Sequence, residues 1–595
     1  MKSLRRMLAY VTPYARDALL ALLLLLGVVA ADLGVPRLSQ HVIDQGIGTG
    51  NVRVIVVTAL LMMAAAVASA LFAIGNTILS VRVSQGFGAD VRSAIVHKVQ
   101  SFSFGNLDRL QTGEMLVRAT SDVTQVQTIV MMGLRILTRA PLWLLGSVVM
   151  LALNSPHLVP LMLILMACVL VLISFFLVRA RPFFLVVQEK LDRLNQVLQE
   201  NLAGMRVVKA FVRTDHESRR FSAANTDLMD QSIRVTQMMA FLFPTMNLII
   251  NFGIAGVIWL GGGRVLAGQG TVGEMVASFN YLTFSLFPMV MLAGMLAPLS
   301  AADASAGRIL EVLDSDPEVR NRTGVAHKVP DHFPGRVVFD DVCFQYNGED
   351  CTEAVLNHID LTAEPGERVA ILGATGSGKS TLIHLIPRFY DVNSGRITLD
   401  GIDVRDLPLE TLRAQVGIAM QEAVLFGGTI RDNIRYGAPE AGDAEVVAAA
   451  QAAQAHDFIA GLPDGYDTVV GQRGVNLSGG QKQRLSIARA LLVRPRVLIL
   501  DDSTSAVDFE TEAKIEAALS EVLQDEFARG TTVFVVAQRI STVISADKIV
   551  VLERGKIAAM GNHETLMATS PIYQEIYASQ LGHRVDQPDR GIADD

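Results

Sequence analysis

The sequence predicts an all-α transmembrane domain of six helices with long cytoplasmic extensions, fused to an α/β domain with a phosphate-binding loop. Three observations predict this fold class. Hydrophobic residues make up 50% of the 595 residues, and their excess lies almost wholly before about Ala306. The remainder has the mixed charge and alternating β/α pattern of a soluble α/β domain. A glycine-rich loop, Gly373 to Ser380, stands between an apolar strand and a helical pattern.

Length and composition restrict the function before any motif is considered. A chain of 595 residues is too long for one hydrophobic core, so we expect at least two domains. The net charge of −8 and the lack of a basic stripe disfavour nucleic-acid binding. The three cysteines, Cys168, Cys343 and Cys351, suggest neither a metal-ligand cluster nor a disulfide framework. The first apolar run lacks a small-residue cleavage site, so we expect no cleaved signal peptide.

Six stretches are long and apolar enough to cross a bilayer, each close to the ~20 residues that a spanning helix needs. The predicted spans lie near 18–36, 54–79, 133–153, 158–178, 241–261 and 275–296. We therefore expect a transmembrane domain at 1–310, a linker at 311–336, the α/β domain at 337–581, and a polar, acidic, disordered tail at 582–595.

The connections between the predicted spans are unequal. Spans two and three, and spans four and five, are joined by long segments rich in Lys and Arg, whereas the short loop Asn154–His157 has neither. By the positive-inside rule, both termini, both long segments and the α/β domain are cytoplasmic, in a multi-pass protein of the cell (inner or plasma) membrane. Apolar residues recur at helical spacing in the long segments, so we expect helices that turn back at Phe104–Asp108 and Thr214–Glu217. Separate soluble insertions are the alternative, which the lack of turn-rich composition disfavours.

Three charged residues lie at or near the predicted spans. Asp32 falls within the first span, and Arg135 and Arg139 are one helical turn apart at the start of the third. Charges at membrane depth usually face protein or a water-filled cavity, so the arginines could line a cavity for anionic or amphipathic ligands. The sequence favours the simpler interpretation, in which they reach the cytoplasmic interface or pair with acids.

The glycine-rich loop has the residues that bind phosphates. Its glycines let backbone N–H groups turn toward the phosphates, and the following helix adds the positive end of its dipole. Lys379 would add a point charge, Ser380 a Mg²⁺ ligand, and Asp501, which ends the apolar run Val497–Asp501, would hold that ion through water. The predicted nucleotide-binding residues here are Gly373, Thr375, Gly376, Ser377, Gly378, Lys379, Ser380 and Thr381.

A second motif identifies a family. Leu477-Ser478-Gly479-Gly480-Gln481, followed by Lys482-Gln483-Arg484, resembles the signature of ATP-binding-cassette (ABC) proteins. The loop, the signature and the strand 497–501 occur in the order of that superfamily. With six spans ahead of them, the chain from about Leu4 to Leu581 resembles one half of an ABC exporter of the multidrug and lipid-flippase type. This resemblance implies ATP and Mg²⁺ as cofactors and a hydrophobic or amphipathic small molecule as transported substrate.

The resemblance also assigns further residues. Tyr346 is similar to the aromatic residue that stacks on adenine, and Gln421 to the glutamine that joins Mg²⁺ to the membrane domain. Ser505–Asp508 is similar to the loop that crosses the dimer interface, which would place Asp508 there. In this family the signature faces away from its own chain's Lys379, so residues 477–481 would complete the ATP site of a second ABC domain.

Two positions depart from the family pattern at the same site. Asp502 stands where the general base is usually Glu, and it is shorter by one methylene, a misplacement that can cost ~100-fold in rate. Gln538 stands at the switch position, usually His, and it cannot carry a positive charge near neutral pH. Either change alone could be neutral drift. Both together resemble the impaired-site subunit of heterodimeric exporters, whose partner is a different half-transporter.

The sequence therefore predicts a subunit of an ATP-driven exporter that supplies the catalytically impaired ATP site of a heterodimer. Two alternatives stay open: a channel or regulator gated by an impaired ATP site, like the cystic fibrosis chloride channel, and an importer with the exporter fold. Gln472 stands where such exporters usually have Glu, which would either change a contact with the membrane domain or have no effect. The identity of the substrate is not encoded in any motif.

Overall fold

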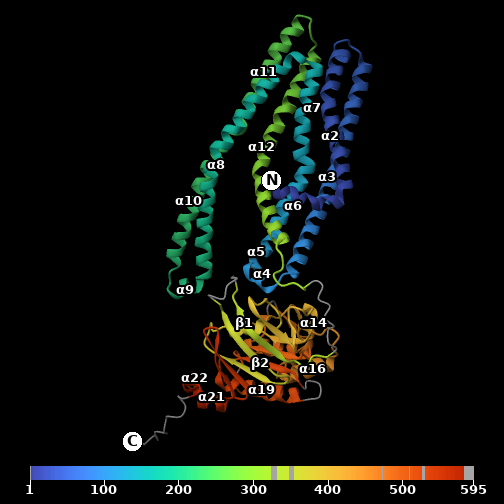
Figure 1. The fold of residues 1–595 in the computed structure, drawn as a ribbon. Helices are drawn as coiled ribbons and strands as arrows, with labels where there is room; N and C mark the ends of the chain where they lie inside the picture. The colour runs from blue at the N-terminus through green and yellow to red at the C-terminus, as the bar shows by residue number, and fades with distance from the viewer. Residues whose placement is uncertain are drawn as a thin grey trace. The chain divides into compact units, whose positions relative to one another are not determined.

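The computed structural model describes residues 2–110, 112–322, 332–346, 354–471, 474–507, 509–524 and 530–581. The chain forms two compact units. The first contains residues 1–100 and 112–315, and the second contains 101–111 and 316–595 (Figure 1). The predicted tail at 582–595, together with Cys351, Gln472 and Asp508, lies outside the described residues.

Six helical stretches in the described part of the first unit are long and apolar enough to cross a membrane, and each contains one predicted span. They run over Lys2–Ile47, Val52–Gln100, Gly113–Asn154, Pro156–Ala203, Thr214–Leu266 and Val272–Asp314. Their main elements are α2 (Ala15–His41), α3 (Val52–Gln100), α7 (Thr138–Asn154), α8 (Val159–Ala203), α11 (Leu242–Leu266) and α12 (Val272–Asp314). The prediction of an all-helical membrane unit is confirmed.

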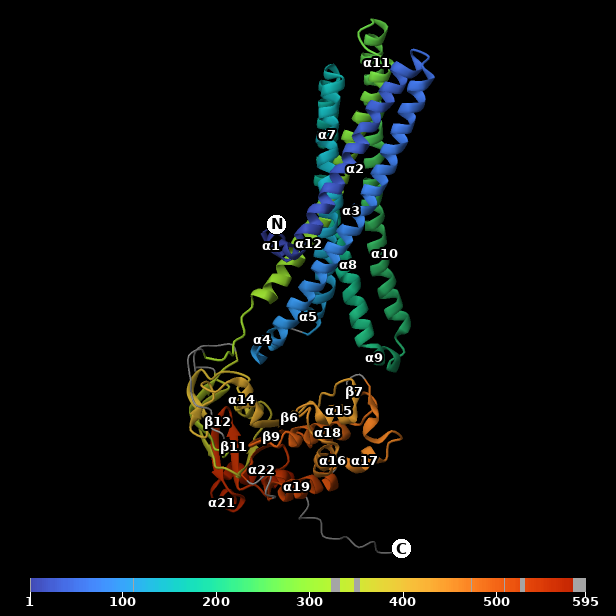
Figure 2. The ribbon, with the colours of Figure 1, turned by 90° about the vertical axis from the view of Figure 1, so that its right-hand side faces the viewer.

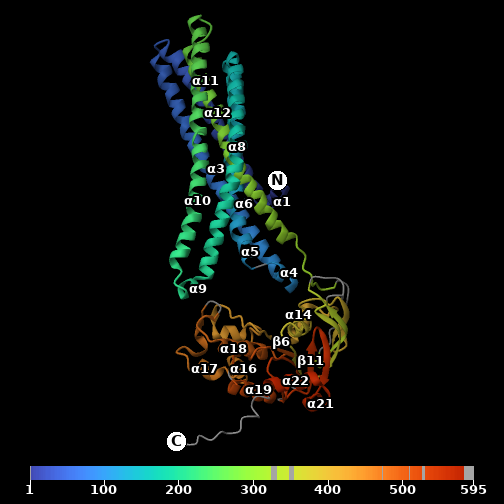
Figure 3. The ribbon, with the colours of Figure 1, turned by 90° about the vertical axis from the view of Figure 1, so that its left-hand side faces the viewer.

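The long connections are continuations of the spanning helices and not separate insertions. Helix α3 has 49 residues, which at about 1.5 Å per residue gives roughly 74 Å, more than twice the ~30 Å hydrocarbon core. Helices α8 and α10 (Thr214–Ala240) run side by side to the short helix α9 (Met205–Ala210), as Figure 3 shows. The chain turns back at α4 (Phe104–Arg109) and between α9 and α10, close to the predicted turns.

The core of the second unit is two sheets. An antiparallel sheet has the order β2-β1-β4-β5, and a six-stranded sheet has the order β12-β11-β3-β10-β9-β6, of which only β12 is antiparallel (Figure 2). Their strands are β1 (Val337–Phe344), β2 (Leu356–Ala363), β3 (Arg368–Leu372), β4 (Ser394–Leu399), β5 (Ile402–Asp403), β6 (Val416–Ala419), β9 (Val497–Asp501), β10 (Thr532–Val536), β11 (Lys548–Glu553) and β12 (Lys556–Gly561).

The register of the parallel sheet brings the predicted site together. Val536 of β10 lies opposite Ile371 of β3 on one side and Asp501 of β9 on the other. Because parallel strands end at the same edge, the segments after β3, β9 and β10 meet there, at the carboxyl edge where α/β sheets bind ligands. These segments hold the glycine-rich loop, Asp502 and Gln538.

Helix α4 packs within the second unit, although the sequence places it between two spans. The ring of Phe104 stacks on Phe389 with centroids 4.0 Å apart, and the Tyr390 hydroxyl donates to Asp108 at 2.6 Å. Burial and the hydrogen bond to Asp108 raise the pKa of Tyr390, so this hydroxyl stays a donor. The turn predicted at Phe104–Asp108 therefore rests on the α/β unit of its own chain.

Candidate functional site: a nucleotide cavity at the sheet edge

The glycine-rich loop joins the buried strand β3 to helix α13 (Lys379–His384). Gly378 immediately precedes the helix with a φ of 101°, which residues with a side chain rarely adopt. A Cβ at this position would lie 2.9 Å from Leu356 Cδ2 and 3.0 Å from the Val355 carbonyl oxygen. The loop therefore requires glycine here for both its backbone conformation and its packing.

Two polar side chains of the loop segment, those of Ser377 and Lys379, are buried. The Lys379 ammonium donates to the carbonyls of Gly373 and Ala374, both at 2.9 Å, and burial lowers the pKa of Lys379, whereas Asp502 and Asp501 oppose that shift. The Ser377 hydroxyl is buried and has no hydrogen-bond partner among the described residues. A buried cation and an unsatisfied hydroxyl at a helix N-terminus fit the oxygens of a phosphate group.

An oxygen pair lies next to the loop. The Ser380 hydroxyl donates to Asp501 Oδ1 at 3.0 Å, and Asp501, at the end of β9, is only 3% exposed. A hydroxyl and a carboxylate are the hard oxygen ligands that Mg²⁺ prefers. The residues present therefore fit a nucleotide with Mg²⁺, which, when bound, neutralises phosphate charge.

The two atypical residues contact each other. Gln538 Nε2 donates to Asp502 Oδ2 at 2.9 Å, and Gln421 Nε2 reaches the same oxygen at 3.4 Å. Burial and the neighbouring Asp501 raise the pKa of Asp502, whereas Lys379, Arg539 and the Gln538 hydrogen bond oppose this shift. One carboxylate oxygen is thus shared by two amides, and neither amide can take up a proton near neutral pH.

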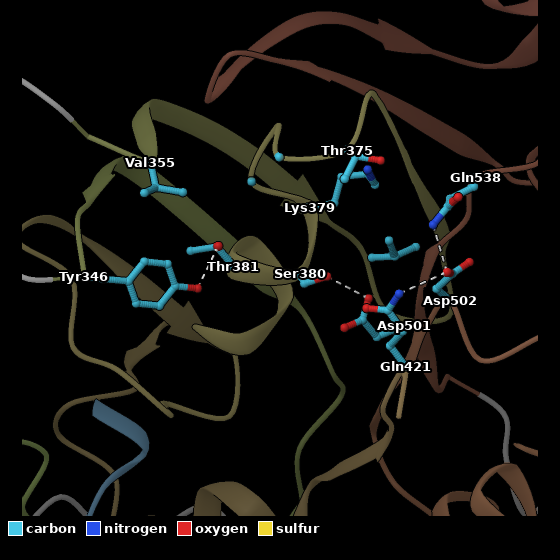
Figure 4. A pocket seen from close by; sticks show the side chains of 13 residues that line it. Tyr346, Val355, Thr375, Lys379, Ser380, Thr381, Gln421, Asp501, Asp502 and Gln538 are labelled. Atoms are coloured by element: carbon cyan, nitrogen blue, oxygen red, sulfur yellow. Dashed lines mark hydrogen bonds between the residues drawn. The ribbon is translucent and has the colours of Figure 1, made fainter. Parts of the chain in front are cut away.

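These residues line one cavity of about 330 Å³ (Figure 4). Tyr346 lies at the opposite end from Asp502 and Gln538, where its hydroxyl and Thr381 Oγ1 are 2.8 Å apart. Tyr346 is 40% exposed, so this residue is partly accessible to a ligand in the cavity. The cavity is lined by Tyr346, Val355, Thr375, Gly376, Gly378, Lys379, Ser380, Thr381, Gln421, Asp501, Asp502, Val536 and Gln538.

The signature residues 477–481 do not belong to this lining. Ser478 is the N-cap of α18 (Gly479–Leu492), where its hydroxyl accepts from Gln481 N at 3.3 Å and Gln481 Oε1 accepts from Ser478 N at 2.9 Å. Ser478 and Gly479 are exposed, and Leu477 is buried beneath them. The structure thus presents the start of α18 on the surface, where the N–H groups of Gly479 and Gly480, which the Ser478–Gln481 capping pair does not use, can bind an anion.

The loop after Asp502 is fixed to the signature helix. Gln483 of α18 donates to Ser505 Oγ at 3.1 Å and accepts from Ala506 N at 2.9 Å. A Cβ on Gly480 would lie 2.9 Å from the Ala506 carbonyl oxygen. Ser505–Val507 and the signature therefore form one packed surface.

Sequence reasoning missed Glu512, in α19 (Phe509–Gln524). It is 5% exposed and accepts from the Thr504 hydroxyl at 3.0 Å, the Thr542 hydroxyl at 2.7 Å and Arg539 at 3.0 Å. This carboxylate joins the segment after Asp502 to the segment after Gln538. Its sequence context, between Glu510 and Lys514, gives no sign of burial.

We expect Glu512→Ala to destabilise the second unit by about 2–3 kcal/mol, because the buried Thr542 hydroxyl and two partly exposed donors, Thr504 and Arg539, lose their acceptor. For a domain of this size that corresponds to a fall of roughly 5–10 °C in the thermal unfolding midpoint. Glu510→Ala is the matched control, since Glu510 pairs with Lys514 at the surface with its side chain 79% exposed. Calorimetry of the purified chain should show little change for this control. Equal midpoints for both variants would contradict the bracing role of Glu512.

Comparison with known proteins identifies the family. Residues 18–289 match the ABC transporter transmembrane region, and residues 356–505 match the ABC transporter family. The ABC transporter ATP-binding protein YfiB of Bacillus subtilis is 40% identical over 588 residues, which cover 97% of this chain and 99% of YfiB. The chain belongs to the ABC transporter family.

Two further ABC transporters point to an exporter. YgaD of Bacillus subtilis, which bears the name of a multidrug export ATP-binding/permease protein, is 35% identical over 596 residues, covering 98% of this chain and 100% of YgaD. The structure of a bacterial Atm1-family ABC exporter with ATP bound superposes with a TM-score of 0.77 and 29% identity, covering 95% of this chain and 98% of that one. This ABC transporter is a multi-pass membrane protein with the Atm1-type exporter fold.

Proposed function

We propose that this chain is one subunit of a heterodimeric ABC exporter, in which it supplies the catalytically impaired ATP site. The observation that carries the proposal is the 2.9 Å hydrogen bond from Gln538 to Asp502. This hydrogen bond connects the two residues that depart from the family pattern. They lie next to a phosphate-binding loop that has all the residues of its motif. The site would hold ATP through Lys379, Ser380 and Asp501 but would cleave it slowly.

Slow cleavage follows from the chemistry of Asp502 and Gln538. A general base must accept a proton from the attacking water in the right position, and Asp is one methylene shorter than Glu. One oxygen of Asp502 is already engaged by Gln538 and Gln421. Gln538 cannot share or carry a proton as histidine does, so it adds no positive charge beside the developing phosphate charge.

The partner's ATP site would be completed by this chain. Ser478, Gly479 and Gly480 lie at the exposed start of α18, outside their own chain's cavity. Nothing in residues 477–481 departs from the family signature, so a partner with Glu and His at the matching positions would form one competent site with them. Asp508, predicted at the dimer interface, would belong to the same contact surface.

The proposed cofactors, orientation and substrate follow from the same arrangement. ATP and Mg²⁺ would occupy the cavity beside Ser377 and Asp501, with adenine against Tyr346. The excess of Lys and Arg in the long connections supports a cytoplasmic ABC domain and cytoplasmic termini. The name of YgaD supports a hydrophobic or amphipathic compound as the exported substrate.

We expect the purified chain alone to bind ATP but to hydrolyse it at least ~100-fold more slowly than the pair formed with its partner half-transporter. The partner to test first is a half-transporter that co-purifies with this chain. Steady-state phosphate release gives the turnover, and ATP photocrosslinking to the chain alone shows that its cavity is folded. Lys379→Ala is the control that should abolish the crosslink. Fast hydrolysis by this chain without a partner would contradict the proposal.

A further inference from the structure

A second cavity lies inside the membrane unit, among α2, α3, the π-helical turn η4 (Gly133–Leu137), α7 and α12. Its volume is about 290 Å³, at the lower end of the range for small-ligand sites. It is lined by Val28, Ala73, Asn76, Thr77, Arg135, Ile136, Arg139, Ala140, Trp143, Phe287 and Met291. Short π-helical turns occur frequently at functional sites because they redirect side chains.

The polar wall of this cavity is held in place. The buried Asn76 side chain donates to the carbonyls of Ala21 at 2.8 Å and Leu134 at 3.2 Å, which ties α2, α3 and the π turn together. Arg139 pairs with Asp32 at 3.0 Å, and Ser69 donates to the same carboxylate at 2.9 Å. The charge of Arg139 is therefore compensated inside the unit, as the simpler interpretation of the sequence expects.

Arg135 differs from Arg139. It lines the cavity, and no ion pair or hydrogen bond of its guanidinium is found among the described residues. Two arginines against one carboxylate leave one uncompensated positive charge at this cavity. Arg135 stands at the start of the third predicted span, and an unpaired charge in or beside a span is costly and generally faces a ligand or a water-filled path.

Two more donors at the cavity lack acceptors. Trp143 Nε1 and Arg139 Nε are buried and have no hydrogen-bond partner among the described residues. The guanidinium of Arg139 lies 4.0 Å from the centroid of the Trp143 ring, which fixes both groups. Unsatisfied buried donors cost free energy, and an acceptor that enters the cavity removes that cost.

Apart from Thr77, the remaining lining is apolar: Val28, Ala73, Ile136, Ala140, Phe287 and Met291. From this combination we infer that the cavity binds the head end of an amphipath that carries one anionic group, a carboxylate, phosphate or sulfonate, on an alkyl body. The anion accepts from Arg135 and Trp143, and the alkyl part packs on the apolar wall. This inference rests on the proposed export function and names the class of its substrate.

The two tryptophans of the chain allow a direct binding test. Trp259 is 84% exposed, so Trp259→Phe leaves Trp143 as the sole fluorescent reporter inside the cavity. The full-length variant in a neutral detergent is titrated with three bromine-tagged undecyl probes, a sulfonate, an alcohol and a trimethylammonium, whose bromine quenches tryptophan on contact. We expect saturable quenching by the sulfonate alone.

Substitutions then assign the charge. Arg135→Gln should weaken sulfonate binding at least 10-fold, and Arg135→Lys should retain it within about threefold, because both cations pair with an anion. Arg82→Gln, which removes an α3 side chain 72% exposed and outside the cavity, should leave binding unchanged. Equal quenching by all three probes, or unchanged affinity in Arg135→Gln, would overturn the inference.

Brominated-chain phosphatidylglycerol distinguishes the source of the anion. Saturable quenching by this lipid, and not by brominated phosphatidylcholine, would identify a membrane lipid as the ligand. Quenching by the sulfonate but by neither lipid would identify a single-chain compound, and both outcomes support an anionic head. These titrations contain no nucleotide, so they test only the ligand of the membrane cavity. The proposal of paired ATP sites is tested separately, by phosphate release, and either proposal can fail without the other.

Discussion

Removal of the Ser478 hydroxyl is expected to lower ATP turnover of the assembled pair by ~100-fold to 1,000-fold, the usual effect of removing one donor that stabilises transition-state charge. The reason is its position. Ser478 stands at the exposed N-terminus of α18 and outside its own chain's cavity, so in the proposed pair the phosphate that it would contact belongs to the partner's site. Asp502→Ala should change turnover by less than about twofold, since little of the pair's chemistry depends on it.

The choice of substitution separates ATP contact from helix stability. Ser478 caps α18, and Ser→Ala at an N-cap costs about 1 kcal/mol, whereas Ser→Gly costs only a few tenths. Ser478→Ala and Ser478→Gly should therefore lower turnover equally if the hydroxyl serves the partner's site. Gly480→Ala is less informative, because its Cβ would press on the Ala506 carbonyl oxygen.

Steady-state ATPase assays on the pair, with ATP binding measured in parallel, decide this point. If Asp502→Ala reduced turnover as much as Ser478→Gly, the assignment of the impaired site to this chain would be wrong. If Ser478→Gly kept full turnover and only Ser478→Ala lost it, helix capping would explain the loss.

Much of the fold could be predicted because its signals are local. The spans are read from runs of apolar residues, and the six helical stretches contain all six of them. The strands β3 and β9 have the bounds of the apolar runs Arg368–Leu372 and Val497–Asp501, since buried parallel strands are continuous hydrophobic runs. The glycine-rich loop and the signature are short segments whose function requires fixed spacing.

Contacts between distant segments could not be predicted in this way. Phe104 and Phe389 stack although 285 positions separate them in the sequence, and no local pattern around either residue predicts this contact. Glu512 is buried because Thr504, Thr542 and Arg539 converge on it, although charged residues in a helix are usually exposed. Likewise, Arg135 and Arg139 look equivalent in sequence, and only Asp32 of another helix makes them different.

The double substitution Asp502→Glu with Gln538→His is expected to raise ATP cleavage at this chain's own site by ~100-fold, with each single change giving less than about tenfold. Groups that act as a unit are non-additive, and the hydrogen bond between these two side chains shows that they contact each other. Asp502→Glu alone leaves a neutral amide next to the longer carboxylate. Gln538→His alone leaves the carboxylate one methylene short of the water that it must position.

The backbone conformation at position 502 gives a second reason to expect only a small gain in ATP cleavage from Asp502→Glu alone. Asp502 has a φ of 47°, a left-handed conformation that Asp tolerates better than most residues, so Glu at this position carries some strain. This strain lowers the gain expected from Asp502→Glu, whether residue 538 is glutamine or histidine. The expected coupling between the two substitutions therefore has a chemical and not a conformational origin.

Single-turnover cleavage of ATP, in a pair whose partner site is disabled at its own general base, isolates the site of this chain. Lys379→Ala in the double variant is the control, and it should remove the gained activity because the phosphate contact is lost. If the fold-increase of the double variant equalled the product of the two single fold-increases, Asp502 and Gln538 would act independently. No gain in the double variant would locate the limitation in the partner's signature, which in the proposed pair would complete this site, because residues 502 and 538 would then both be of the competent type.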